Sequence, residues 1–279
     1  DIVFAEPDRT SLYRSLPALA ALTGRQMPAT SLEGLEPAER QAALRQAFRE
    51  VLAAPLAEAK TEIPLDNDIA FAEAIRSSPR VVLGYFFQQD NDGQMDPLKP
   101  VVPYGGGIFL PKWEDSSKRY SPFKDQDVIP YRPVLNFSLY DDAAEERCGS
   151  FNSFMYLRGT VFSGTVRRVP LIWQYADNLY PQLPLQMIRI GDGGGQGLVR
   201  IEKSNLTQGV EYIELRKRKI ITDELGRLYV NFRGKGRTFD YLSACDIVAE
   251  KIDASRLRGR YVLVGSSAGG LLDLRSTPF

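Results

Sequence analysis

Apolar residues recur along the first part of the chain in the patterns of helices and short buried strands. The first residues, Asp1–Ala5, predict a short buried strand that is already under way at the first position, so we expect the chain to begin inside a domain. Pro37 opens the clearest early helix, in which Leu44, Phe48, Val51 and Leu52 repeat at the spacing of one buried face.

A strand, a helix and a second strand follow one another in this part of the chain. The acids of Asp66-Asn67-Asp68 cap a predicted helix that Ser77-Ser78-Pro79 ends, and the apolar stretch 80–86 is the next predicted strand. This order is typical of a parallel crossover unit. The sequence therefore predicts an α/β fold with a largely parallel central sheet flanked by helices, whose carboxyl edge is where such folds bind ligands.

The pattern becomes irregular between residues 88 and 133, where prolines, glycines and short polar stretches dominate. We expect one irregular excursion from the domain. Loops of this length are usually functional, so a lid or partner surface is one interpretation. An insertion with no defined role is the other.

Alternating and β-branched residues return from Phe151 to Gly236 and predict an added β-rich section. Strands are expected at 151–157 and 166–175, paired around Ser163-Gly164, and at 198–201, 211–215, 217–221 and 228–232, with 223–226 closing a hairpin. A helix is expected to open at Tyr180-Pro181 and to end at a left-handed Gly191. A helix over 243–250 and a fully buried strand, Tyr261–Val264, complete the series.

Composition removes several classes of function. The 279 residues, 43% of them hydrophobic, suffice for one large domain or two small ones. The 35 basic residues balance 35 acidic ones, which argues against nucleic acid as a partner. No stretch approaches the roughly 18 apolar residues of a membrane-spanning helix. The chain contains no histidine, which removes the classical catalytic triads and most zinc chemistry.

Cysteines and arginines give structural expectations. Cys148 and Cys245 could form one long-range disulfide, but two separate buried thiols are the preferred interpretation. Arg167-Arg168 precedes an apolar strand, so one arginine is expected to face the core side and to pair with a carboxylate, and Arg233 is expected to behave similarly. The basic stretch 216–219 is expected to be a solvated hairpin edge.

The turn after the predicted strand at 261–264 has a sequence that resembles a nucleophile elbow. Gly265-Ser266-Ser267-Ala268-Gly269 fits the pattern G-x-S-x-G, and a histidine-independent serine hydrolase is therefore an alternative function. That chemistry needs a base downstream, and only ten residues follow Gly269. Two other interpretations are a backbone site for a polar or anionic ligand and a tight turn that requires glycine.

Polar residues also follow the first predicted strand. Glu6, Asp8 and Arg9 stand at its carboxyl end, and Ser266, Ser267 and Asp273 follow the last predicted strand. If both strands are parallel, these six residues meet at one edge of the sheet. We predict that they line a ligand pocket, while the structural alternative is that they cap helices and form ion pairs at the rim.

The order of several motifs resembles the second class of CHASE domains, the cyclase/histidine-kinase-associated sensing extracellular domains of bacterial receptors. The resemblance spans nearly the whole chain. It is carried by Asp1–Arg9, Asp66-Asn67-Asp68, Val81–Gly84, Val166–Leu171, Val230–Gly234, Tyr241–Ala244 and Leu257–Asp273 with Thr277-Pro278. The chain departs from the family where Val161-Phe162-Ser163-Gly164 replaces an acidic turn, and in the unmatched excursion. We expect the family's opening strand and helix, and its membrane segments, to lie outside the given residues.

The resemblance implies a single sensor domain over residues 1–279, truncated at its amino end. It would lie in the extracytoplasmic part of a cell-membrane receptor, bind a small ligand or an extracytoplasmic protein, and regulate a cytoplasmic nucleotide cyclase or kinase. It implies a homodimer in the full-length receptor, contact with the membrane only through flanking helices, and no catalytic residue, metal or cofactor in this chain. A dimerisation spacer that binds no ligand is a further alternative.

Overall fold

The computed structural model describes part of the chain, in two compact units. The described residues are 66–88, 103, 109–113, 132–152, 156–157, 160–161, 166–175, 178–203, 208–236 and 238–265, with 36, 39–40, 42–44 and 46–47. The larger unit comprises Asp1–Val3, Val82–Leu135 and Glu145–Phe279, and the smaller one comprises Phe4–Val81 and Asn136–Ala144.

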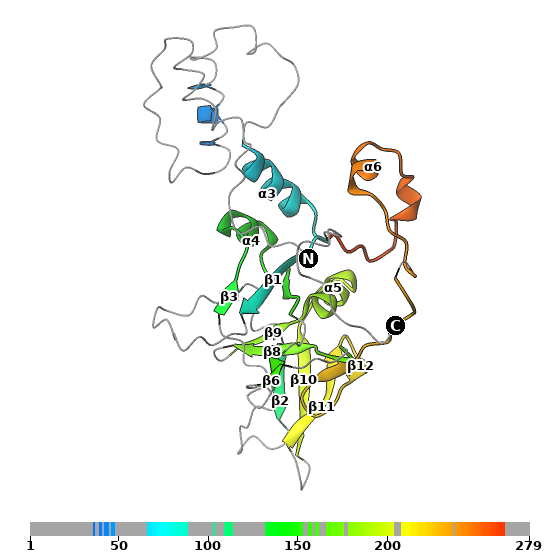
Figure 1. The fold of residues 1–279 in the computed structure, drawn as a ribbon. Coiled ribbons are helices and arrows are strands. Elements are labelled where there is room, and N and C mark those ends of the chain that lie inside the picture. Colours follow the sequence, from blue (N-terminus) through cyan, green and yellow to red (C-terminus); the bar gives the residue numbers. More distant parts are fainter. Residues whose placement is uncertain are drawn as a thin grey trace. The chain divides into compact units, whose positions relative to one another are not determined.

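Two helices form the described core of the smaller unit. Helix α3, Asn67–Ser77, buries Ile69, Ala72 and Ile75, and it packs against α4, Ser138–Ala144 (Figure 1). The predicted helix is confirmed, and so is its stop before Pro79, because α3 ends at the residue pair that precedes this proline. Leu44, which belongs to the predicted helix after Pro37, is buried as expected, whereas Phe48, Val51 and Leu52 lie outside the described residues.

The larger unit contains a three-stranded sheet around β1, Leu83–Gln88. Strand β4, Cys148–Ser150, lies parallel to the first half of β1, and β3, Arg132–Val134, lies antiparallel to its second half. Helix α5, Leu183–Gly191, packs on β4. The parallel β1–β4 pair therefore gives the sheet a carboxyl edge, close to the start of α5.

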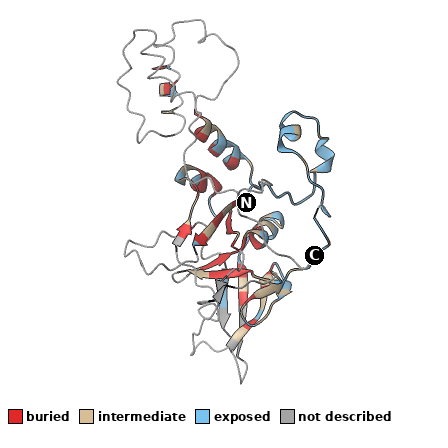
Figure 2. Cartoon of the chain, in the orientation of Figure 1, coloured by how far each residue is buried: buried red, intermediate tan, exposed pale blue. Residues whose placement is uncertain are grey.

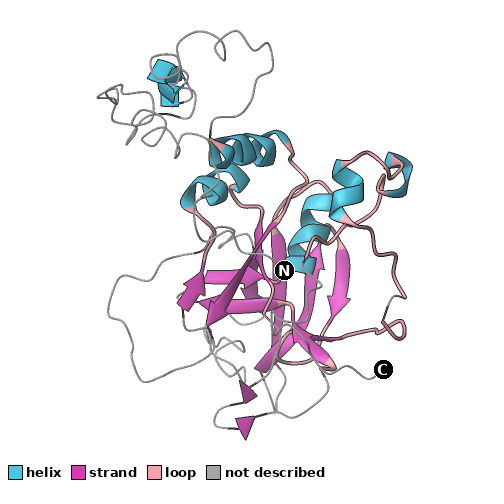
Figure 3. Cartoon of the chain, turned by 45° about the horizontal axis from the view of Figure 1, so that its top comes forward, coloured by secondary structure: helices cyan, strands magenta, loops and turns pink. Residues whose placement is uncertain are grey.

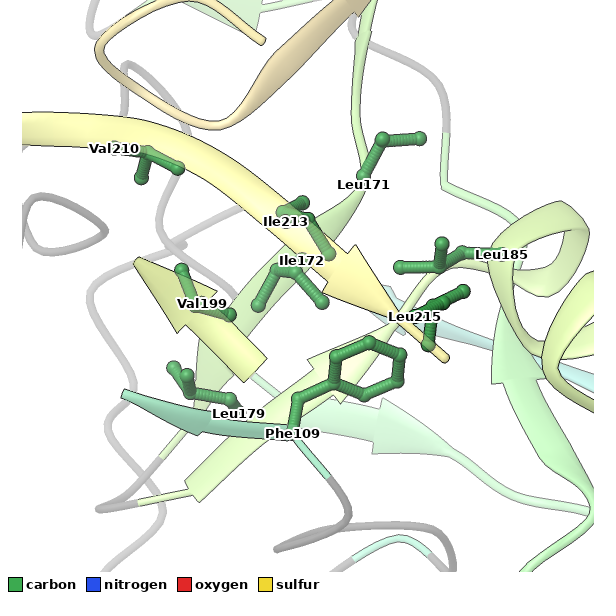
Figure 4. Packing of buried hydrophobic residues seen from close by; sticks show 9 residues of the cluster. All are labelled: Phe109, Leu171, Ile172, Leu179, Leu185, Val199, Val210, Ile213 and Leu215. Carbon is green, nitrogen blue, oxygen red and sulfur yellow. The ribbon is translucent and has the colours of Figure 1, made fainter. Parts of the chain in front are cut away.

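A second sheet has the order β12-β11-β10-β2. Its strands are β2 (Phe109–Trp113), β10 (Gly197–Lys203), β11 (Gln208–Leu215) and β12 (Arg218–Ile221). Its buried side chains meet those of β8, β9 and α5 in one apolar core (Figure 4), which consists of Phe109, Leu171, Ile172, Leu179, Leu185, Val199, Val210, Ile213 and Leu215. The irregular excursion predicted for residues 88–133 thus supplies a core strand, β2, and most of β3.

Three antiparallel strand pairs complete the larger unit. They are β5 (Tyr156–Leu157) with β6 (Thr160–Val161), β7 (Arg168–Pro170) with β13 (Arg227–Tyr229), and β8 (Ile172–Tyr175) with β9 (Asn178–Pro181). The expected pairing around Ser163-Gly164 is wrong, because each candidate strand has a different partner. The turn at 223–226 likewise closes no hairpin, since β13 pairs with β7 and not with β12.

The α/β class is confirmed, but the largely parallel central sheet is not what the structure shows. The described strands form several small mixed sheets that run in different directions (Figure 3). Only β1–β4 and β10–β2 are parallel among the described strand pairs. The physical reason is that most strands of the β-rich section follow each other through short turns, which favour antiparallel pairing.

The carboxyl-terminal part of the described chain is almost fully exposed (Figure 2). Helix α6, Ala244–Val248, and the 3-10 turn η3, Ala254–Arg256, bury no residue. The predicted helix over 243–250 is confirmed by α6. The predicted buried strand Tyr261–Val264 is wrong for this structure, because all four residues are exposed and form no strand.

Local expectations have mixed outcomes. Gly191 is the last residue of α5 and has no left-handed backbone, which begins only at Gly193 with a φ of 92°. Neither Cys148 nor Cys245 forms a disulfide, and the former is buried whereas the latter is exposed, so the expectation of two buried thiols is half right. Arg167 is exposed, whereas Arg168 pairs with Asp223 at 3.4 Å, as expected.

The other two basic segments are exposed. Arg233 is exposed, and this differs from the expected partly buried arginine because the chain around it forms no strand. The stretch Arg216–Lys219 is the exposed β11–β12 hairpin, as predicted, and its turn uses positive φ angles at Arg216 and Lys217.

Candidate functional site

The six residues predicted to line a ligand pocket lie outside the described residues. They are Glu6, Asp8, Arg9, Ser266, Ser267 and Asp273. The serine turn is described only as far as Gly265. The predicted pocket therefore stays a prediction, and the described structure defines instead what occupies the carboxyl edge of the β1–β4 pair.

Asn152 stabilises that edge through hydrogen bonds of its side chain. It follows β4, and its side chain continues the parallel ladder where the β4 backbone turns away. Its Oδ1 accepts a hydrogen bond from the Phe87 amide at 2.7 Å, and its Nδ2 donates to the Phe87 carbonyl at 2.6 Å. The Ser150 hydroxyl donates to the same Oδ1 at 2.7 Å. Because Phe87 is only 1% exposed, these bonds satisfy backbone groups that water does not reach.

Helix α5 adds a second layer of buried polar side chains. Gln182, at its N-cap, donates from Nε2 to the Asn152 carbonyl at 2.8 Å. One turn later, Gln186 donates from Nε2 to the Glu146 carbonyl and accepts from Arg189 Nε at 2.8 Å. The polar side chains thus run continuously from the end of β4 along the buried face of α5.

Among the residues whose burial is described, Arg189 is the only fully buried cation, with 2% of the residue exposed. Its Nη1 donates to the Gly195 carbonyl at 3.0 Å and lies 3.4 Å from Glu146 Oε1. It stands in the last turn of α5, where the helix dipole favours a positive charge. These contacts tie the end of the helix to the glycine loop at 193–195.

An aromatic cluster lies beside the amide groups. The ring of Phe87 is 6.4 Å from Trp173, 5.3 Å from Tyr175 and 6.0 Å from Tyr180, measured between centroids, and Tyr85 lies 5.5 Å away. Trp173 and Tyr180 face each other across the β8–β9 hairpin. The carboxyl edge is therefore a rigid layer of aromatic rings next to hydrogen-bonded amides, and burial of the rings stabilises it.

Burial raises the pKa of the Tyr180 hydroxyl above its usual value of 10.0, and the Asn178 side chain opposes this shift only in part. The folded state thus binds this proton more tightly than the unfolded state does. The stability that the neutral phenol contributes is complete below the unfolded pKa and is lost as the pH rises through the folded one.

We expect Tyr180→Phe to resist alkaline unfolding. At pH 7 its free energy of unfolding should match or exceed that of the unchanged chain by up to about 1 kcal/mol, because the buried hydroxyl makes no hydrogen bond of normal geometry with the described residues. As the pH rises above the ordinary tyrosine pKa of about 10, its urea midpoint should fall less than that of the unchanged chain. Tyr241→Phe, at a 73% exposed position, should change neither value. Equal alkaline losses in Tyr180→Phe and the unchanged chain would contradict the assignment.

A separate polar cluster belongs to the smaller unit. Asp66 is fully buried at the N-cap of α3, where its Oδ1 accepts from the amides of Asp68 at 3.0 Å and Ile69 at 3.3 Å. Its Oδ2 lies 3.0 Å from Arg40 Nη2. The Tyr140 hydroxyl donates to Asp68 Oδ1 at 2.6 Å and so joins α4 to α3. The predicted acidic cap is confirmed.

The polar side chains of both clusters position parts of the fold. Their members are amides, hydroxyls and charged groups that hydrogen-bond to one another or to the backbone. Within the described residues, no group of three or more acidic or cysteine side chains could hold a metal ion. A search of the same residues for a helix long and apolar enough to cross a membrane finds none.

Sequence reasoning missed the side chains at the carboxyl edge. Asn152 and Gln186 lie in segments for which only the apolar periodicity supported a prediction. A single amide side chain forms no sequence motif. One usable signal existed in Arg189, because a cation on the buried face of a short amphipathic helix needs a partner. That signal would have pointed to α5 as part of the site.

Comparison with known families identifies the class of protein. The model of the CHASE2 domain matches residues 1–279, the whole chain. The chain therefore belongs to the CHASE2 domain family, a family of sensory extracellular domains of signalling receptors. Searches of curated proteins and of solved structures give no match.

Proposed function

We propose that the chain is the extracytoplasmic input domain of a bacterial membrane receptor. It binds a small ligand or a protein partner and regulates a cytoplasmic nucleotide cyclase or kinase. The observation that carries this proposal is the family match over all 279 residues. The receptor functions as a homodimer in which differential binding shifts the balance between two states.

We propose that Glu6, Asp8, Arg9, Ser266, Ser267 and Asp273 line the ligand site, as the sequence predicts. Within the larger unit, the carboxyl edge of β1 and β4 is held by Asn152 and by the buried face of α5, so a ligand that bound there would meet a preorganised frame. Preorganisation lowers the cost of binding, because few groups lose freedom when the ligand arrives.

We expect a thermal-shift screen of the 279-residue chain against metabolites, inorganic anions and divalent metals to find a stabilising compound. A ligand present at a hundred times its dissociation constant stabilises the folded state by roughly 2.7 kcal/mol. Asp8→Ala and Ser267→Ala should abolish the shift and leave the unliganded melting temperature nearly unchanged.

The opposite result is equally informative. A shift that persists in both variants would place the site elsewhere, and a flat screen would favour a protein partner or a spacer without ligand. Covalent labelling by a fluorophosphonate separates the hydrolase alternative, since the sensor predicts no labelled serine.

A further inference from the structure

The buried guanidinium of Arg189 has donors that the fold does not use. Its Nε donates to Gln186, and its Nη1 donates to the Gly195 carbonyl at 3.0 Å and lies 3.4 Å from Glu146 Oε1. Its Nη2 is buried and has no hydrogen-bond partner within the described part of the chain. A buried donor without an acceptor costs stability, and a charged donor costs more, so such a group needs an explanation.

The charge of Arg189 is also weakly compensated. Among the described residues, Glu146 is the only acid that contacts it, and the 3.4 Å between them is longer than a strong charge-assisted hydrogen bond. The Glu146 side chain is 55% exposed, so water competes for its carboxylate. A buried cation is stable only with close, well-oriented partners. Arg189 therefore has both the free donors and the charge to bind an anion.

A loop without side chains lies against this guanidinium. Gly193, Gly194 and Gly195 all have left-handed backbones, with φ angles of 92, 75 and 101°. An added Cβ at Gly194 would lie 4.0 Å from Arg189 Nη1, whereas Gly193 and Gly195 are exposed. Because glycine moves between backbone conformations at little steric cost, a small shift of the loop is enough to separate the Gly195 carbonyl from Nη1.

A second arginine contacts the same loop. Arg216, in the turn between β11 and β12, donates from Nη2 to the Gly193 carbonyl at 3.2 Å, and an added Cβ at Gly193 would lie 3.1 Å from that nitrogen. Arg216 is exposed and has no acidic partner among the described residues. Nearby Arg218, in contrast, pairs with Asp192 at 3.3 Å. The glycine loop thus contacts two guanidinium groups, one buried and one exposed, neither of which has a close carboxylate.

We propose that Arg189 and Arg216 form a binding site for a small oxyanion, a carboxylate or phosphate group. Nη1 and Nη2 of Arg189 donate to two oxygen atoms of the ligand, one of which replaces the Gly195 carbonyl. Arg216 moves from the Gly193 carbonyl to the same ligand group. Planar guanidinium groups favour such paired bonds to oxyanions. The two positive charges outweigh the negative end of the α5 dipole, which alone would disfavour an anion here.

The test is a titration of the 279-residue chain with inorganic phosphate at constant ionic strength. The melting temperature and the NMR signal of the Arg189 Nε–H group should both change and saturate at the same concentration. A parallel titration with acetate shows which of the two oxyanion groups the site prefers.

Three variants probe the charges around the loop. Arg216→Gln should weaken phosphate binding about tenfold, because it removes one charge-assisted hydrogen bond. Glu146→Gln should tighten binding, because the competing carboxylate is removed. Arg233→Gln changes an exposed arginine elsewhere in the same unit, is the matched control, and should leave the affinity unchanged. All three variants alter side chains that are more than half exposed or lie on the surface, so the folded state should persist in each.

Three outcomes would overturn the proposal. The first is an Arg189 signal that neither phosphate nor acetate shifts to saturation. The second is equal phosphate affinity in Arg216→Gln and the unchanged chain. The third is an equal loss in Arg216→Gln and Arg233→Gln, which would mean that phosphate responds only to the general surface charge.

This site and the predicted ligand pocket can be tested separately. A phosphate response that Arg216→Gln weakens should persist in Asp8→Ala and Ser267→Ala, since neither residue belongs to the site at the glycine loop. A response that those two variants abolish reports the predicted pocket instead. Failure of one site therefore leaves the test of the other intact.

Discussion

Asn152→Ala should be among the most destabilising substitutions in the larger unit, lowering the free energy of unfolding by about 4 kcal/mol, because each buried orphaned group costs roughly 1–3 kcal/mol. The change removes both partners of the Phe87 backbone and the acceptor of the Ser150 hydroxyl. Alanine offers no replacement, and Phe87 is sealed by aromatic rings on one side. Urea unfolding followed by tryptophan fluorescence measures the loss, since Trp173 lies in the affected cluster.

Ser150→Ala is the matched control. It removes the hydroxyl bond to the same Asn152 oxygen and the longer bond that the hydroxyl accepts from the Asn152 amide at 3.4 Å, but it leaves the Phe87 amide and carbonyl paired. A loss of roughly 1–2 kcal/mol is therefore expected. If the two variants lose the same stability, the Asn152 side chain does not continue the ladder in solution. In that case, water or another group satisfies Phe87.

The local elements of this protein were more predictable than its strand pairing. Helix α3 was found because Asp66 supplies a cap and Pro79 a stop, both of which act within a few residues. The strands β10, β11 and β12 were found because their alternation and turns are local as well. In contrast, β7 pairs with β13 across almost sixty residues of chain, and no local signal specifies such a partner.

The prediction for the carboxyl-terminal run failed for a related reason. Tyr261–Val264 has the composition of a buried strand, and the sequence prediction rested on composition alone. Burial of a strand requires a neighbour with an open edge, which is a property of the whole sheet.

The candidate site also has features that the sequence predicts and features that it does not. The family was recognisable from ordered motifs spread over the chain, since membership depends on many positions at once. The side chains that build the carboxyl edge were not recognisable, because Asn152 and Gln182 act through single amide groups whose partners are distant backbone atoms. Amide side chains that bond distant backbone atoms follow no fixed spacing in the sequence. Only the folded structure shows which backbone groups they bond.

Asp66→Ala should be the most damaging change in the described part of the smaller unit, with an expected loss of about 3 kcal/mol. The substitution removes the acceptor of two amides at the start of α3 and leaves Arg40, whose side chain is 27% exposed, without this carboxylate. Circular dichroism during urea unfolding and hydrogen exchange at the Asp68 and Ile69 amides measure the loss.

Asp66→Asn separates the two contributions of this carboxyl group. Asparagine caps helices as well as aspartate does, so only the ion pair with Arg40 is lost, and about 1 kcal/mol should go with it. Ser77→Ala, which removes an exposed hydroxyl bond at the other end of the same helix, should cost almost nothing. Equal losses for the alanine and asparagine variants would mean that the ion pair, and not the cap, accounts for the stability that Asp66 provides. The start of α3 would then depend on Arg40 holding the carboxylate in place.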